Sequence, residues 1–166
     1  LFSEESKSGS METLMTLPVN EVHVVTGKYL ASFLSTLIMI SPSIFYVITT
    51  AIFGDPDVGP IIGGYIGTIF LCAGFTAVGV FASSVTKNQI IAFFTGFIIC
   101  IALTMIDTFL VFLPSNIVEF VSYISADMHF RSITQGIIDS RDLVYFITVF
   151  ALFFTATIKV QQNAKK

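Results

Sequence analysis

Long uncharged stretches separated by short polar segments dominate the pattern of this chain. Residues 29–54, 58–86 and 88–106 contain no Asp, Glu, Lys or Arg, and each approaches or exceeds the roughly 20 residues that cross a bilayer as a helix. A fourth stretch, 143–158, is shorter, so we expect its helix to begin before Asp142. The pattern predicts four transmembrane helices, at about 29–53, 60–82, 88–113 and 140–160.

The connection 114–139 is more apolar than a solvated loop should be. Its apolar residues keep helical spacing on both sides of a polar break at 125–127, which predicts two short amphipathic helices at the membrane surface. The residues concerned are Ile117, Val118, Val121 and Ile124, then Phe130, Ile133 and Ile137. We divide the chain into an opening segment 1–28, a transmembrane domain 29–160 that includes this connection, and a tail 161–166.

Composition assigns the same class. Hydrophobic residues make up 54% of the chain and charged residues 11%, and the mean hydropathy is +0.87, values well outside those of soluble domains. The uncharged stretches are continuous rather than alternating, which favours helices over a transmembrane barrel. We therefore predict an all-α integral membrane protein.

The basic residues predict an orientation. With four spans both termini lie on one side, and that side holds every lysine of the chain: Lys7, Lys28, Lys87, Lys159, Lys165 and Lys166. Because lysine and arginine accumulate on cytoplasmic loops, we expect both ends to be cytoplasmic. The net charge of −3 arises from acidic residues gathered on the other side, and the absence of a basic patch argues against a nucleic-acid partner.

Two local patterns predict where helices bend or begin. Pro42, between Ser41 and Ser43, is expected to kink the first span, either as a static bend or as a hinge. Thr86 and Gln89 have the spacing of a capping box that would begin the third span.

Two further patterns within the spans indicate packing or transport. Gly63-x-x-x-Gly67 has the small-residue spacing that lets helices approach closely, and marks a possible interface or pathway. Asp107 is a carboxylate near the outer end of the third span. It has either a role in a substrate or proton pathway or a paired position at headgroup level.

Enzyme and cofactor motifs are absent from the sequence. It contains no Gly-x-Ser-x-Gly, no His-Glu-x-x-His, no Cys-x-x-Cys and no Gly-x-x-x-x-Gly-Lys-Ser/Thr. His23 and His129 are predicted on opposite sides of the membrane, and Cys72 and Cys100 are expected to be packing groups within spans. We expect no catalytic residue, no metal site and no cofactor on this chain, so any ATP would be bound by another chain.

The opening segment has one apolar side and one polar side. Met11, Leu14 and Met15 share a helical face, Glu12 lies on the other, and Pro18 ends the pattern. The pattern alone predicts a short amphipathic helix along the cytoplasmic surface, which could be no more than an interfacial anchor.

Residues 4–19, EESKSGSMETLMTLPV, resemble the coupling segment of type-2 ATP-binding-cassette (ABC) exporter permeases, through Glu5, the Ser8-Gly9-Ser10 run, Glu12, Leu14 and Pro18. Three later stretches look like landmarks of the same family, closest to its gliding-motility and copper-site-maturation branch. They are GKYLASF at 27–33, FASSVTKNQ at 81–89 and HFRSITQGIIDSRDLVYF at 129–146. The resemblance covers essentially the whole chain.

The resemblance implies a permease with six spans in a prokaryotic cytoplasmic membrane, paired as a homodimer and served by separate ATPases that bind ATP and magnesium. On that basis the chain, which begins at Leu1, is expected to lack the first two spans. The resemblance implies ATPase coupling through Glu5, Gly9, Met11, Glu12, Leu14, Met15 and Pro18, and an external gate that includes His129, Phe130 and Arg131. The alternative is a membrane scaffold that keeps the fold without transporting.

Overall fold

A computed structural model describes residues 2–8, 20–106, 108, 122–136 and 139–164 of the chain. Over these residues the regular structure is helical. The helices are α1 (Phe2–Ser8), α3 (Glu21–Ile40), the 3-10 helix η1 (Ser41–Ser43), α4 (Ile44–Phe53), α5 (Val58–Val85), α6 (Gln89–Met105), α8 (Ala126–Thr134) and α9 (Ser140–Ala164).

Three of the described helices are long and apolar enough to cross a membrane: Glu21–Phe53, Val58–Val85 and Ser140–Asn163. The last begins before Asp142, as its short uncharged stretch predicted. Helix α6 is also apolar but has 17 residues. The predicted span 88–113 extends beyond α6 into residues that the structure does not describe, and so does the first of the two amphipathic helices predicted in the connection.

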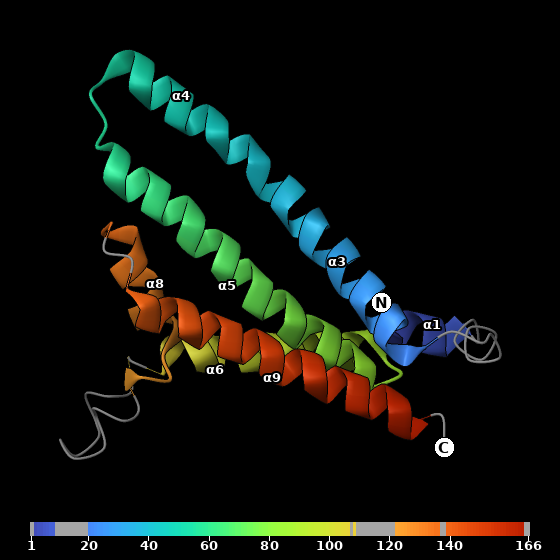
Figure 1. Cartoon of the computed structure of the whole chain (residues 1–166). Helices are drawn as coiled ribbons and strands as arrows, with labels where there is room; N and C mark the ends of the chain where they lie inside the picture. The colour runs from blue at the N-terminus through green and yellow to red at the C-terminus, as the bar shows by residue number, and fades with distance from the viewer. Residues whose placement is uncertain (1, 9–19, 107, 109–121, 137–138, 165–166) are drawn as a thin grey trace.

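Helices α3, η1 and α4 follow one another as a single rod (Figure 1). Asn20 begins the rod, because its side-chain oxygen accepts a hydrogen bond from the backbone N–H of Val22 at 3.1 Å. Pro42, which cannot donate a backbone hydrogen bond, lies in η1, so the distortion expected there takes the form of one 3-10 turn. The hydroxyls of Ser43 and Tyr65 lie 2.9 Å apart and join this turn to α5.

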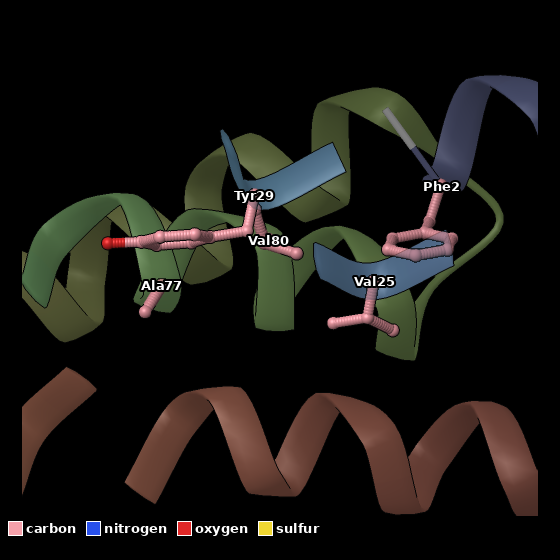
Figure 2. Packing of buried hydrophobic residues seen from close by; sticks show 5 residues of the cluster. All are labelled: Phe2, Val25, Tyr29, Ala77 and Val80. Carbon is pink, nitrogen blue, oxygen red and sulfur yellow. The ribbon is translucent and has the colours of Figure 1, made fainter. Parts of the chain in front are cut away.

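Helix α5 lies at the centre of the bundle, with α9, α6, α8 and α3 packed around it. Its first turn is capped by Asp57, whose carboxylate accepts from the N–H of Gly59 at 3.1 Å. A core cluster forms where α1, α3 and α5 meet, from Phe2, Val25, Tyr29, Ala77 and Val80 (Figure 2).

Tyr29 joins this core to α9. Its ring contacts those of Phe150 and Phe154, with centroids 5.0 and 5.7 Å away. The tyrosine is buried, and its hydroxyl donates to the carbonyl of Ala73 on α5 at 3.1 Å, which satisfies the polar end of the side chain. One residue thus connects three long helices at the end of the bundle where α1 lies.

The start of α6 corrects one prediction. Thr86 and Gln89 do not form a capping box, because Asn88 is the N-cap and its side-chain oxygen accepts from the N–H of Ile90 at 2.9 Å. Thr86 instead accepts from the N–H of Asn88 at 3.2 Å, which closes the preceding turn. Asparagine caps helices as well as threonine does, and Asn88 lies closer to the apolar stretch. It therefore takes the N-cap position that was predicted for Thr86.

Candidate functional site

The first of two candidate sites is the docking of α1 onto the bundle. Phe2 and Ser3 are almost fully buried, with 2% and 1% of their surface exposed. The backbone N–H of Ser3 donates to the hydroxyl of Ser83 on α5 at 3.1 Å, and the two serine hydroxyls lie 3.2 Å apart. Helix α1 is therefore fixed to α5 by both apolar burial and hydrogen bonds.

Lys28 on α3 completes this contact, which we call the α1 anchor: Phe2, Ser3 and Glu5 on α1 with Lys28 and Ser83. The ammonium group of Lys28 pairs with the Glu5 carboxylate and lies 4.5 Å from the centroid of the Phe2 ring. A cation over an aromatic face is attracted to it, and more strongly where water is excluded. The anchor thus joins the opening segment to α3 as well as to α5.

Of the residues predicted to couple to an ATPase, the described part of the chain contains Glu5, which lies in the α1 anchor. The others, Gly9, Met11, Glu12, Leu14, Met15 and Pro18, lie outside the described residues. Sequence reasoning missed the contributions of Phe2, Ser3 and Ser83. For Phe2, the signal available in the sequence was a large apolar side chain at the start of a polar segment.

The second candidate site is the packing of α8 on the glycine face of α5. Gly63 and Gly67 are buried, and a Cβ atom at Gly63 would collide with the backbone carbonyl oxygen of Ile133 on α8. A Cβ atom at Gly67 would lie 3.2 Å from the Ile133 side chain and 3.3 Å from that of Phe130. The two glycines therefore let α8 approach α5 closely. Gly136, just after the end of α8, has a φ of +83°, a conformation that favours glycine.

Helix α8 also contacts α9 through His129. The Nδ1 atom of His129 lies 2.7 Å from the Asp142 carboxylate, and Nε2 lies 3.1 Å from the carbonyl oxygen of Tyr123. The Tyr145 ring stacks on the imidazole with centroids 4.3 Å apart, and its hydroxyl donates to the carbonyl of Ile124 at 2.7 Å. His129 and Asp142 are both buried.

The three consecutive residues predicted for an external gate take three different surroundings. His129 faces α9, Phe130 lies over Gly67 on α5, and Arg131 is exposed and pairs with Asp127 at 2.6 Å. Asp107, predicted either to act in a substrate or proton pathway or to be paired at headgroup level, lies outside the described part of the chain. The structure therefore brings His129 and Phe130 into the packing of α8 and leaves Arg131 on its surface.

A cavity of about 640 Å³ lies between α3, α5 and α6. Its walls are mostly apolar, and the hydroxyls of Ser32 and Thr36 on its α3 side donate to carbonyls of their own helix. Cys72 and Cys100 both line it as free thiols. Among the described residues no group of three or more His, Cys, Asp or Glu side chains could hold a metal ion.

The described residues form a nearly all-helical structure with three long apolar helices, and glycines let the helices pack closely. These features are those of a multi-pass membrane protein. Residues 1–163 match the family model described as ABC-2 family transporter protein, and the chain belongs to that family. No curated protein and no solved structure matches it. Membership supports a permease subunit of an ABC transporter, and the family implies an ABC ATPase as its partner.

Proposed function

We propose that the chain is the permease subunit of an ATP-driven exporter, homodimeric in a prokaryotic cytoplasmic membrane, and that residues about 4–18 couple it to a separate ATPase. ATP and magnesium are bound by that ATPase, and this chain carries no catalytic residue and no cofactor. Within the family, we propose that the chain is closest to the gliding-motility and copper-site-maturation permeases. Both ends of the chain face the cytoplasm in this proposal.

The α1 anchor is the observation that supports this proposal most. An ATPase that holds residues 9–18 in a groove, with Met11, Leu14 and Met15 as apolar contacts, would pull on a segment whose other end is fixed at Phe2, Ser3 and Glu5. Because the anchor contacts both α3 and α5, a displacement of the segment would move two long helices together. A rigid-body transition driven by ATPase closure requires such a joint movement of helices.

The distribution of charge supports the proposed orientation. Lys7, Lys28, Lys87 and Lys159 belong to α1, the start of α3, the turn between α5 and α6, and the end of α9, which gather at one end of the bundle (Figure 1). Helix α8 with its Arg131 lies at the other end. The lysine-rich end is the cytoplasmic one by the positive-inside rule, and the ATPase would bind there.

Helix α8 is proposed as part of the gate at the external exit. It rests on α5 through glycine contacts and on α9 through a buried polar contact, so two surfaces must separate before it can move. His129 and Phe130 lie at those two surfaces, and Arg131 remains at the solvent side.

Co-purification of an ATPase tests this function. The full-length subunit, extracted in mild detergent, is expected to recover an ABC ATPase whose hydrolysis rate changes when the subunit is reconstituted with it in lipid. A scaffold that has lost transport would predict an ATPase whose rate is indifferent to the subunit. Recovery of no ATPase from a folded subunit would contradict the proposal.

A further inference from the structure

We infer that the cavity between α3, α5 and α6 holds one acyl chain of an anionic phospholipid, whose headgroup lies at the end of the cavity near α1. The site rests on the depth of the cavity, on its lining and on the charges beside it. The assignment of this end to the cytoplasmic leaflet, and the effect on an ATPase given below, rest on the proposed function.

The cavity is about as deep as one leaflet of a bilayer. Its lining on α5 runs from Leu71, at the middle of the helix Val58–Val85, to Ser83 near the lysine-rich end. At a rise of about 1.5 Å per residue this distance is about 18 Å. Half of the roughly 30 Å hydrocarbon core is about 15 Å. The cavity therefore has the length that a single acyl chain occupies.

The cavity opens sideways, toward the surface that the membrane covers. Phe93 and Phe97 of α6 line it with 64% and 50% of their surface exposed, and their rings stack with centroids 5.9 Å apart. Gly79 of α5 also lines it and is exposed. Because these helices are surrounded by lipid, an acyl chain can enter the cavity directly from the bilayer.

The lining differs between the two ends of the cavity. Ser3, Ser83 and Gln89 lie at the end near α1 and offer hydroxyl and amide groups that can donate to phosphate oxygens. Further along, the walls are mostly apolar, and the hydroxyls of Ser32 and Thr36 already donate to carbonyls of α3. A molecule with a polar head and a hydrocarbon chain matches this lining, because burial of the chain is favourable only at the apolar end.

Lysines give the polar end a net positive charge. Lys87 is exposed in the turn between α5 and α6, and Lys7 is exposed near the end of α1. Of the two carboxylates of α1, Glu5 is paired with Lys28 and Glu4 is exposed, so the lysines outnumber the carboxylates. Lysines at a membrane surface attract anionic lipids, which favours a headgroup with a net negative charge.

A protein helix fits this cavity less well than a lipid chain. A transmembrane helix crosses roughly 30 Å of hydrocarbon, whereas the cavity ends near Leu71 at the middle of α5. Helix–helix contacts in membranes also favour small residues, whereas Phe93 and Phe97 form part of the opening.

The bound lipid would contact the α1 anchor, because Ser3 and Ser83 belong to the anchor and also line the cavity. The lipid would thus lie against the contact that is proposed to carry ATPase movement into the bundle. Under the proposed function, we expect the stimulation of the ATPase to fall severalfold in bilayers that lack anionic lipid.

Photo-crosslinking tests the site in the full-length subunit without its ATPase, in nanodiscs of equal parts phosphatidylglycerol and phosphatidylcholine. The photoreactive amino acid benzoylphenylalanine replaces either Phe97, in the cavity, or Leu152, which is 57% exposed on α9. Mass spectrometry then identifies each adduct. We expect phosphatidylglycerol to exceed phosphatidylcholine about fivefold at position 97, the effect of one lysine near the headgroup, and to follow the bulk composition at position 152. Bulk composition at position 97, or crosslinks there to protein alone, would overturn the inference.

Gly79→Leu and Gly64→Leu are matched variants on α5, because a Cβ atom at either position meets nothing within 4 Å. The first places a side chain in the cavity, whereas Gly64 lines a smaller cavity on the other half of the helix. We expect the yield of the phosphatidylglycerol adduct at position 97 to fall severalfold in Gly79→Leu and to stay unchanged in Gly64→Leu. Equal yields in the two variants would contradict the inference.

Lys87→Gln tests the headgroup without any change to the cavity. We expect it to remove the roughly fivefold preference for phosphatidylglycerol, whereas Lys159→Gln, at an exposed lysine on α9, keeps the preference. A preference that survives Lys87→Gln, or is lost equally in both variants, would contradict the anionic headgroup. ATPase recovery tests the proposed function separately, and recovery of no ATPase by a subunit that selects phosphatidylglycerol would contradict that function alone.

Discussion

Gly63→Ala is expected to displace α8 from α5, whereas Gly64→Ala, one residue further along the same helix, is expected to be tolerated. The methyl group at position 63 would collide with the backbone carbonyl of Ile133, while a Cβ atom at Gly64 meets nothing within 4 Å. A flexible side chain could move aside, but a carbonyl within α8 cannot move without the helix. Overpacking of this kind costs about 1–3 kcal/mol.

The two alanine variants make a controlled pair because the change in helix propensity is the same in both. Replacing glycine by alanine within a helix ordinarily gains roughly 0.5–1 kcal/mol. Thermal unfolding of the full-length subunit in detergent should therefore show a lower midpoint for Gly63→Ala and an equal or higher one for Gly64→Ala. Equal midpoints for the two variants would contradict the packing of α8 on the glycine face.

Lys28→Glu is expected to release α1 and to reduce ATPase stimulation severalfold. The substitution places a second carboxylate beside Glu5 and removes the cation from the Phe2 ring. The ion pair and the cation–π contact together contribute about 1–2 kcal/mol, after allowance for the partial exposure of Glu5. The substitution leaves unchanged residues 9–18, which we propose the ATPase holds. We therefore expect the ATPase to co-purify while the stimulation of its rate falls severalfold.

A charge exchange controls this prediction. Glu5→Lys combined with Lys28→Glu restores opposite charges at the same two positions and is expected to recover part of the stimulation. Rescue should be incomplete, because the cation would then lie on α1 rather than over the Phe2 ring from α3. If the single and double variants were equally impaired, the ion pair would not be the part of the α1 anchor that transmits movement.

The long helices and the membrane class could be predicted from the sequence, because uncharged runs of this length have few alternative structures. The glycine pair at Gly63 and Gly67 also signalled a close packing surface, although the sequence did not reveal that its partner is α8. The predicted span 88–113 is described as a helix over Gln89–Met105, so the number of spans stays a prediction.

The polar contacts could not be predicted in the same way. Ser3 and Ser83 are 80 residues apart in sequence, and His129 and Asp142 lie on different helices. Such pairs depend on the relative placement of helices, about which periodicity carries no information. The start of α6 shows the same limit over a few residues. Thr86 and Asn88 could each have capped the helix, and Asn88 is the residue that does so.

We propose that residues about 4–18 transmit ATPase movement to the permease. Glu12→Lys combined with Leu14→Asp changes the polar and apolar sides of that segment, and Asp55→Lys with Val58→Asp makes the same types of change at exposed positions at the opposite end of the bundle. The most direct test is the ATPase recovered with each full-length variant and its hydrolysis rate in lipid. We expect wild type and the Asp55/Val58 variant to recover a stimulated ATPase and the Glu12/Leu14 variant to lose it. Equal recovery and stimulation in all three would contradict the account.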